Sequence, residues 1–398
     1  LRSIKPDARS LSHSIEVEQQ LGHGKEVQAL FAAYVAQRGP TPALLAAYGE
    51  ACFLLGEDEQ ARVAWERGVR MAVEDETELG GLPKIEVVVS DDRSDPFEAA
   101  AVARRAVGDP QVFAVIGHLT SGCAIEASRI YSQAALAMIT PSATATALTT
   151  QQDRPDWGGE RVVFRLPPSD AMQGEFAADY AVKRLSLKSF VLVHDRTPYG
   201  LGLAETFRGA LERKGGSASR FEAVSLGDKD FGPAVKAIIA ARPDAVFYGG
   251  IYMEAGLLIK QARAAGYHGA FLSGDATKNT DFFTAAGAAG DGAYISIGGV
   301  PVEALPSAAD FVERYQKRWA GAVPRAYDHY GYEAARVALV ALRRAGYPDR
   351  KKVLDAVRNT NMRAMVGDIV FDSKGDTLRG IVTMTKADFA RKKFEVIY

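Results

Sequence analysis

The chain has 398 residues, of which 47% are hydrophobic and 24% are charged, and its formal net charge at pH 7 is −1. This composition is typical of a globular protein of two or three domains, and the balanced charge gives no electrostatic support for a nucleic-acid partner. No run of about 18 apolar residues is present, so the sequence predicts no membrane span.

Residues 1–76 are predicted to be helical throughout. The stretch KEVQALFAAYVAQRG, residues 25–39, has apolar residues at helical spacing and ends at a Gly-Pro stop signal. In PALLAAYGEACFLLGEDEQARVAWERGVRMAVED, residues 42–75, small residues recur on both sides of Gly56. This spacing resembles a tetratricopeptide repeat, in which small residues let two helices approach closely. Two amphipathic helices without a repeat relationship remain the alternative.

From residue 84 onward, short apolar strands alternate with helices of ten or more residues. This alternation is typical of βαβ units and parallel sheets. The expected strands cover 84–92 (KIEVVVSDD), 112–117, 137–142, 161–166, 189–195, 221–226, 244–250, 269–275 and 292–299. The expected helices cover 97–107, 124–135, 171–185, 201–214, 231–241, 253–265, 307–320, 328–345 and 350–358, before a β-rich end over 367–398. The sequence therefore predicts an α/β protein with two lobes rather than one large sheet.

Polar side chains follow several of these strands, at the end of a parallel sheet where ligands bind. Hydroxyl-rich helix starts suit a ligand carboxylate, a lone acid suits an ammonium, and tyrosines offer apolar faces with polar tips. An α-amino acid, which carries both charges, would satisfy all three kinds of group. The residues after the strands are His118, Leu119, Thr120, Ser121 and Gly122, then Pro141, Ser142, Ala143 and Thr144, then Thr197, Pro198, Tyr199 and Gly200, then Ile251, Tyr252, Met253 and Glu254, and finally Asp275.

Each of these residues also has an ordinary structural explanation. Ser and Thr after a strand commonly act as helix N-caps, the two tyrosines could be core aromatics, and Asp275 could cap a turn. His118 and His194 fit structural histidines, and Asp91 and Asp92 fit a solvated turn. Recurrence at the strand ends of both lobes is what favours a ligand site. The two cysteines, Cys52 and Cys123, fit no metal motif, and we expect two free buried thiols.

Residues 84–398 resemble the periplasmic leucine/isoleucine/valine-binding protein family, the type I solute-binding components of ABC transporters. The resemblance rests on several motifs in order: VSDDRSDPFEAAAVARRAV, FAVIGHLTSGCAIEASRIYSQAALAMITPSATATALT, VFRLPPSDAMQGEFAADYAVKRL, VLVHDRTPYGLGLAETF, DKDFGPAVKAI, PDAVFYGGIYMEAGLLIKQARAAG and FDSKGDTLRG. It implies two lobes joined by three crossings, near Phe164–Pro167, Ile295–Gly299 and Val366–Val370, with a ligand cleft between the lobes.

On this resemblance the first lobe covers 77–165 and 297–367, and the second covers 166–296 and 368–398. The family's carboxylate-binding turn corresponds to Leu119, Thr120 and Ser121, and its second contact turn to Ser142, Ala143 and Thr144. Tyr199 and Tyr252 match cleft positions of the second lobe, and Asp275 matches the acid that holds the ligand ammonium.

The sequence departs from the family pattern at several positions. Asp275 stands where the family usually has Glu, and Arg93 stands where one half of a first-lobe disulfide would be. Ile251 replaces a commonly aromatic residue. The family's first strand and its cleft turn have no clear equivalent apart from SIEVEQQLGHG, residues 14–24, and Tyr48 is not assigned to that turn.

The expected function is capture of an aliphatic, branched-chain amino acid for an ABC transporter permease. The expected location is periplasmic or extracytoplasmic, with or without a lipid anchor, since the start LRSIKPDARS fits a chain whose signal peptide has been removed. No catalytic motif, metal-ligand spacing or cofactor fingerprint is present, so the sequence predicts no enzyme and no cofactor.

The alternatives are a regulatory scaffold, like the penicillin-binding protein activator lipoproteins, which also join repeat-like helices to a solute-binding fold, and a ligand-sensing domain. In the scaffold alternative the N-terminal helices would bind a protein partner.

Overall fold

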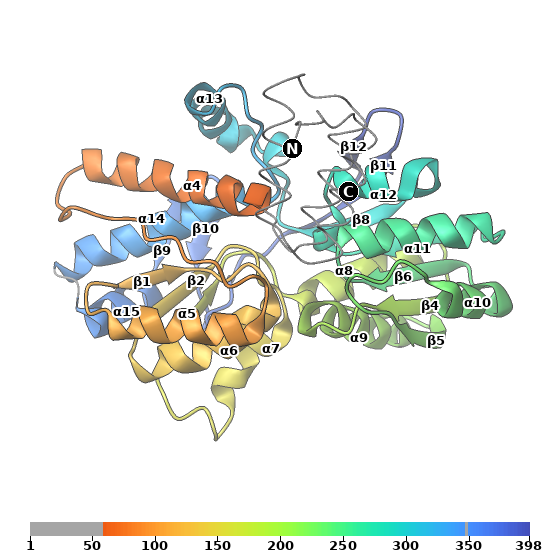
Figure 1. Ribbon diagram of the computed structural model, residues 1–398, viewed down its shortest axis with the longest axis horizontal. Helices are drawn as coiled ribbons and strands as arrows, with labels where there is room; N and C mark the ends of the chain where they lie inside the picture. The colour runs from red at the N-terminus through yellow and green to blue at the C-terminus, as the bar shows by residue number, and fades with distance from the viewer. Residues whose placement is uncertain (1–58, 347–348) are drawn as a thin grey trace, which may run out of the picture. The chain divides into compact units, whose positions relative to one another are not determined.

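The computed structural model describes residues 59–346 and 349–398, with side chains from residue 66 onward. The predicted helix over 25–39, most of the repeat-like segment, Tyr48 and Cys52 lie outside the described residues. The described part consists of two lobes, each built on its own sheet, with the chain passing between them three times (Figure 1). Among the described helices, none is both long and apolar enough to cross a bilayer.

The first lobe is built on a three-stranded parallel sheet in the order β1-β2-β3. A separate antiparallel hairpin, β9-β10, belongs to the same lobe. Its elements are α4 (Glu59–Glu78), α5 (Pro96–Gly108), β1 (Ala114–Ile116), α6 (Ser121–Gln133), β2 (Ala137–Thr140), α7 (Thr146–Thr150), β3 (Val163–Arg165), α13 (Ala309–Arg318), α14 (Asp328–Ala345), α15 (Arg350–Arg358), β9 (Asn361–Ala364) and β10 (Gly367–Val370).

The strand predicted over 84–92 is wrong, because residues 81–92 carry no regular secondary structure. A strand is stable only when a neighbour pairs with it, and among the described residues β1 pairs with β2 alone. The segment keeps a strand-like alternation of burial: Ile85 and Val87 pack against the lobe, while Val88 is exposed. Its β-branched composition therefore gave the right local preference without the pairing that makes a strand.

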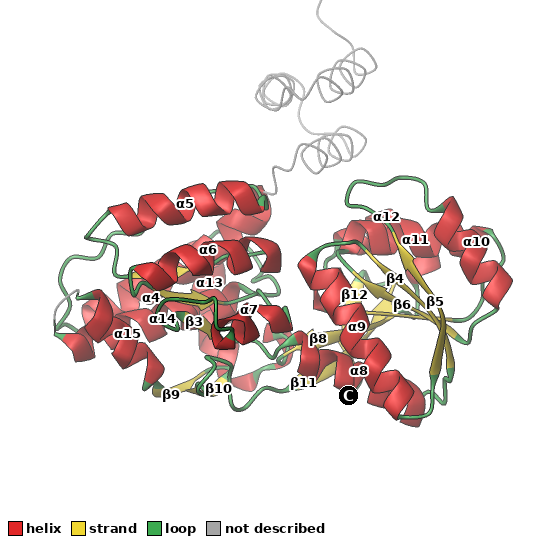
Figure 2. Ribbon diagram, turned by 90° about the horizontal axis from the view of Figure 1, so that it is seen from below, coloured by secondary structure: helices red, strands yellow, loops and turns green. Residues whose placement is uncertain are grey.

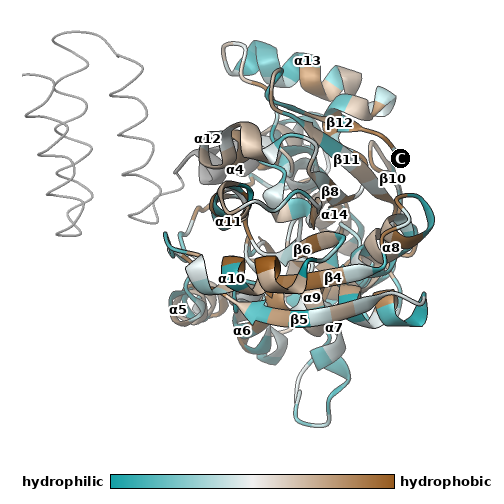
Figure 3. Cartoon of the chain, turned by 90° about the vertical axis from the view of Figure 1, so that its right-hand side faces the viewer, coloured by the Kyte–Doolittle hydropathy of each residue, from teal (hydrophilic) through white to brown (hydrophobic). Residues whose placement is uncertain are grey.

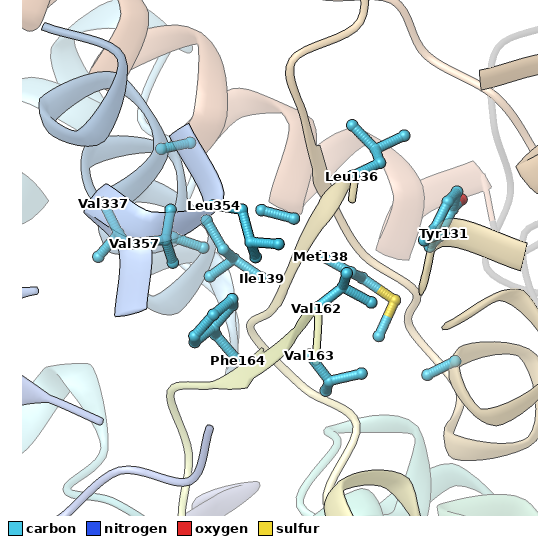
Figure 4. Packing of buried hydrophobic residues seen from close by; sticks show 14 of the residues in the cluster. Tyr131, Leu136, Met138, Ile139, Val162, Val163, Phe164, Val337, Leu354 and Val357 are labelled. Carbon is cyan, nitrogen blue, oxygen red and sulfur yellow. The ribbon is translucent and has the colours of Figure 1, made fainter. Parts of the chain in front are cut away.

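Helices cover both faces of the first sheet. On one face Ile139 of β2 and Phe164 of β3 lie toward Val337, Leu354 and Val357 of α14 and α15 (Figure 4). Helices α5 and α6 cover the other face. All four residues of β2 are buried, as expected for a strand covered on both sides in a parallel sheet. This core fixes the sheet edge at which the turns after β1 and β2 lie.

Helix α5 begins at a well-formed N-cap. The Asp95 carboxylate accepts hydrogen bonds from the backbone N–H groups of Phe97 (2.7 Å) and Glu98 (3.1 Å), and Pro96 occupies the first helical position. We expect Asp95→Ala to lower the free energy of unfolding by about 1 kcal/mol, measured by urea denaturation. Asp95→Asn keeps the acceptor and should lower the free energy of unfolding by about a few tenths of a kcal/mol at most. Equal losses in the two variants would show that the cap is not the cause.

The second lobe is built on a seven-stranded sheet in the order β12-β11-β8-β7-β6-β4-β5. Strands β5, β4, β6, β7 and β8 run parallel, whereas β11 is antiparallel to both β8 and β12. Its elements are α8 (Asp170–Lys183), β4 (Ser189–His194), α9 (Pro198–Arg213), β5 (Ser217–Ala223), α10 (Gly232–Ala241), β6 (Ala245–Gly249), α11 (Tyr252–Ala264), β7 (Ala270–Ser273), α12 (Asp281–Ala286), β8 (Tyr294–Gly298), β11 (Val382–Asp388) and β12 (Lys393–Val396).

This sheet is the middle layer of three. Alternate residues of β4 point to opposite faces: Phe190 and Leu192 pack against α8 and α9, whereas Val191 and Val193 pack against α10, α11 and α12. Figure 2 shows the two helical layers, and Figure 3 shows apolar colour along β4 and β6 in the middle of the sheet. Helices on both faces leave the ends of the strands as the places where polar loops collect.

Two of the three predicted crossings agree with the structure. The chain leaves the first lobe after β3 and returns from the second after β8. The third, predicted at 366–370, is wrong, because Ile369 and Phe371 pack in the core of the first lobe and the chain joins the second sheet only at β11, Val382–Asp388. The assignment of residues 368–371 to the second lobe is corrected accordingly.

The boundary predicted at residue 76 falls inside α4. Val69 and Ala72 of this helix pack against α13 and α14 of the first lobe. The carboxylate of Glu76 is buried and accepts hydrogen bonds from Arg336 (3.2 Å) and Arg343 (2.7 Å) of α14. Gly68 permits this approach, since a Cβ there would lie 2.3 Å from the backbone oxygen of Asp328. The second half of α4 is therefore an integral part of the first lobe.

Candidate functional site

Two turns of the first lobe, after β1 and after β2, are tied together. The Ser121 hydroxyl accepts a hydrogen bond from the backbone N–H of Ala145 at 3.1 Å. The Ser142 hydroxyl donates to the backbone oxygen of Leu119 at 2.9 Å. The neighbouring parallel strands end at the same edge of the sheet, so their turns meet there as predicted.

Thr140, the last residue of β2, forms hydrogen bonds to both turns through its hydroxyl. Its hydroxyl accepts from the backbone N–H groups of Ser142 (3.3 Å) and Ala143 (2.9 Å) and donates to the backbone oxygen of His118 (3.2 Å). Ala143 is buried in the core of the lobe, so it sets the position of the turn rather than offering a polar group. Thr140 was not among the predicted site residues because it lies inside a strand.

The N-caps of α9 and α6 differ in their side-chain hydrogen bonds. Thr197 caps α9 in the ordinary way, because its hydroxyl accepts from the backbone N–H of Gly200 at 3.0 Å. Thr120 stands at the N-cap of α6, but its side chain makes no capping hydrogen bond. The first N–H groups of α6 are thus not satisfied by the Thr120 side chain, which leaves them available to an anion.

Asp275 opens a short 3₁₀ turn, Asp275–Thr277, directly after β7, and is only 3% exposed. One carboxylate oxygen accepts a hydrogen bond from the hydroxyl of Tyr199 at 2.8 Å, and the other accepts from the hydroxyl of Tyr327. Burial raises the pKa of Asp275, and the hydrogen bonds from Tyr327, Tyr199 and Gln173 oppose that rise. A carboxylate has about four acceptor positions, so these partners leave capacity for an ammonium group.

The acid of the second lobe is joined to the turns of the first. Tyr327, which binds Asp275, immediately precedes α14 of the first lobe. The backbone N–H of Asp170 donates to the backbone oxygen of Thr144 at 2.8 Å, and the Asp170 carboxyl lies close enough to Asp275 for each charge to oppose the other. These contacts link Asp275, through Asp170, to the turn that carries Thr144, and the hydrogen bond between Ala145 and Ser121 links that turn to the start of α6. A ligand site shared by Ser121, Thr144 and Asp275 stays a prediction.

Three polar residues of this site were missed by the sequence argument. Asp170 and Gln173 lie one turn apart at the start of α8, in the motif PPSDAMQG that follows β3. Tyr327 follows no strand, so no local pattern marks it. Four buried oxygen atoms in this group have no hydrogen-bond partner among the described residues: the Thr144 hydroxyl, both carboxylate oxygens of Asp170 and the side-chain oxygen of Gln173. Such atoms are costly unless a ligand or a proton satisfies them.

Two predicted residues have other surroundings. Tyr252 begins α11 and packs, partly buried, against the cluster of α10, α11 and α12, and its assignment to the ligand site stays a prediction. Leu119 is 37% exposed and takes part through its backbone oxygen. The candidate site discussed below therefore consists of Ser121, Ser142 and Thr144 from the first lobe, with Tyr199 and Asp275 from the second.

Behind the first turn lies a buried polar network. His118 pairs with Asp92 at 2.6 Å through Nδ1 and with the Tyr131 hydroxyl at 3.0 Å through Nε2, which agrees with a structural histidine. The prediction of a solvated turn is wrong for Asp92. Burial raises its pKa, but His118 and the backbone N–H of Ser94 outweigh burial and hold the pKa below its usual value. Cys123 is a free buried thiol, as predicted, and burial raises its pKa to about 12.

The comparisons with known proteins agree with this architecture. Residues 55–392 match the family described as periplasmic binding protein. A Leu/Ile/Val-binding protein homolog 2 of Brucella abortus is 34% identical over 313 residues, covering 78% of this chain and 81% of the relative. An amino acid binding protein of Pseudomonas aeruginosa is 32% identical over 314 residues, with coverage of 78% and 81%.

Solved structures with the same fold include two binding proteins. The leucine-binding protein LivK of Thermotoga maritima has a TM-score of 0.75 at 29% identity, covering 84% of this chain and 94% of that one. The branched-chain amino acid binding protein LivJ of Streptococcus pneumoniae, solved with isoleucine, has a TM-score of 0.73 at 27% identity and the same coverage. With its two-lobe type I fold and its match over most of its length, this chain belongs to the periplasmic binding protein family.

Proposed function

We propose that this chain is the extracytoplasmic solute-binding component of an ABC transporter and that it binds an aliphatic, branched-chain amino acid. The observation that supports the proposal is the position of Asp275: a buried acid of the second lobe whose carboxylate accepts hydrogen bonds from Tyr199 of its own lobe and Tyr327 of the first lobe. Similarity to a Leu/Ile/Val-binding protein homolog and to a branched-chain amino acid binding protein solved with isoleucine supports the same ligand class.

In this proposal the two charged ends of the ligand bind to opposite sides of the site. The ammonium binds the Asp275 carboxylate through charge-assisted hydrogen bonds, which are stronger than neutral ones. The carboxylate binds at the N-terminus of α6 beside Ser121, where free N–H groups and the helix dipole favour an anion, and it contacts the Thr144 hydroxyl. Tyr199 and Tyr327 orient the acid between them.

The same geometry explains how binding would be signalled to a transporter. A ligand held by Asp275 on one lobe and by Ser121 and Thr144 on the other gains both sets of contacts only when the lobes are closed. It therefore shifts an open–closed equilibrium toward the closed form, which is the form that a permease would recognise. The permease is thus the proposed protein partner.

Isothermal titration calorimetry with the purified chain tests the proposal. We expect leucine, isoleucine and valine to bind, and the two analogues that each lack one charged group, 3-methylbutylamine and 4-methylpentanoate, to bind at least about 100-fold more weakly than leucine. That factor corresponds to about 2.7 kcal/mol for each lost charged contact. If no α-amino acid gives measurable heat, the assigned ligand is wrong. If either analogue binds as well as leucine, the contact assigned to the charged group that it lacks is wrong.

A further inference from the structure

Asp170 is a buried acid for which the proposed ligand contacts give no explanation. It is the first residue of α8, where the chain has just passed from the first lobe to the second. Its side chain is fully buried, and neither carboxylate oxygen has a hydrogen-bond partner among the described residues. An ionised carboxylate in this position would lack the compensation that buried charges require.

Among the described residues, the groups around Asp170 add no free positive charge. The titratable and charged side chains that face it are Asp275, Arg165, Tyr199 and Tyr327. The Arg165 guanidinium is already engaged, because it donates to the carboxylate of Asp376, the backbone oxygen of Ala145 and the hydroxyl of Thr149. Two acids therefore share a buried site in which no uncommitted cation from the described part of the chain acts on Asp170.

The pKa of the Asp170 carboxyl follows from its burial and from its charged neighbours. Burial and the charge of Asp275 raise its pKa to about 8, against smaller opposing effects of Thr144 and Arg165. Near neutral pH the group is therefore mostly a carboxylic acid with one proton to donate. An amino acid ligand has no net charge, so it binds without leaving an unpaired carboxylate only if one of the two acids is neutral.

Thr144 is the neighbouring hydroxyl, close enough to the Asp170 carboxyl to lower its pKa. Its backbone oxygen accepts from the backbone N–H of Asp170 at 2.8 Å, and its hydroxyl is buried without a hydrogen-bond partner among the described residues. A hydroxyl can accept from one side while it donates its single proton to the other. If Asp170 donates to Thr144, the hydroxyl proton of Thr144 is free to point at the ligand.

We propose that Asp170 is an uncharged positioning residue, whose O–H donates to the Thr144 hydroxyl so that Thr144 in turn donates to the ligand carboxylate. This inference rests on the proposed function. An ionised Asp170 would reverse the chain, because Thr144 would donate to Asp170 and present lone pairs to the ligand carboxylate. Asp170 would thus select ligands with one ammonium and one carboxylate, and only while it is protonated.

The test is the dissociation constant of leucine between pH 6 and pH 9 for the wild-type chain and for Asp170→Asn. In the wild type we expect affinity to be constant at low pH and to weaken about tenfold between pH 7 and pH 9, as Asp170 ionises. Asn keeps an N–H donor toward Thr144 and does not titrate, so Asp170→Asn should bind within about threefold of the wild type at pH 6 and show a flat profile. Changes in Asp275 or in the ligand itself affect both proteins equally.

A second experiment measures the number of protons that the protein takes up when it binds leucine. Titrations at pH 8.5 in buffers of different ionisation enthalpy should show that the wild type takes up between about 0.5 and 1 proton more than Asp170→Asn on binding leucine. Thr144→Val, which removes the hydroxyl at nearly constant volume, should weaken binding at pH 6 and lose the pH dependence. Thermal unfolding verifies that each variant is folded. If Thr144→Val does not fold, the comparison of the wild type with Asp170→Asn is enough to test the inference.

The outcomes separate this inference from the function on which it rests. A wild type that binds no amino acid overturns both. A wild type that binds leucine with the same pH profile and proton uptake as Asp170→Asn overturns the inference alone. The same holds if Asp170→Asn loses more than about tenfold in affinity at pH 6, since a charge would then be needed at this position.

Discussion

Replacing Asp275 by alanine should abolish amino acid binding, with a loss of about 2–5 kcal/mol, or roughly 30-fold to several thousand-fold in affinity. The variant removes the buried acid to which the ligand ammonium is assigned, and it leaves the hydroxyls of Tyr199 and Tyr327 without their acceptor. Calorimetry with leucine measures the loss. Asp275→Asn separates the two effects, because the amide oxygen still accepts from a tyrosine while the charge is gone. It should lose most of the affinity and little stability.

The matched control is Glu212→Gln, which removes an acid from an exposed position on α9, the helix that also carries Tyr199. We expect its affinity for leucine to equal that of the wild type. Urea denaturation of all three variants identifies any loss that comes from misfolding. If Asp275→Asn binds leucine within threefold of the wild type, the ammonium is not held by this residue, and the orientation of the ligand has to be reversed or abandoned.

The position of Asp275 was predictable from sequence because local rules determine it. A short apolar strand that alternates with helices belongs to a parallel sheet, and the residue after such a strand lies at the ligand edge. The same rule located Ser121 and Thr144. Applied to β3, it points to Asp170 in LPPSD, five residues after the strand ends, but the two intervening prolines made that segment look like a mere connection.

Other parts of the structure depend on contacts that no local pattern reports. Tyr327 reaches Asp275 only because α14 packs on the first sheet with its N-terminus at the junction of the lobes. The strand predicted over 84–92 has the composition of a strand but no neighbour to pair with among the described residues. The strand predicted over 221–226 is β5, Ser217–Ala223, which begins earlier because an edge strand tolerates the polar residues at its start.

The other large effect expected is on stability, from Arg165→Met. Arg165 is completely buried at the end of β3, and its guanidinium donates to three acceptors: the Asp376 carboxylate at 2.9 Å, the backbone oxygen of Ala145 at 2.7 Å and the Thr149 hydroxyl at 2.8 Å. Methionine fills similar volume but leaves these acceptors unpaired. We expect the free energy of unfolding to fall by about 3–5 kcal/mol, seen as a lower midpoint in urea denaturation.

A neighbouring arginine supplies the comparison. Arg161 pairs with Asp153 at 2.6 Å and donates to the backbone oxygen of Ser373, but its side chain is 43% exposed, so water can replace both contacts. Arg161→Met should therefore cost less than about 1 kcal/mol. Since Arg165 also holds the oxygen of Ala145, whose N–H binds Ser121, we expect Arg165→Met to weaken leucine binding as well. Equal destabilisation by the two variants would contradict the structural role assigned to Arg165, because that role depends on its burial and on its additional hydrogen bonds.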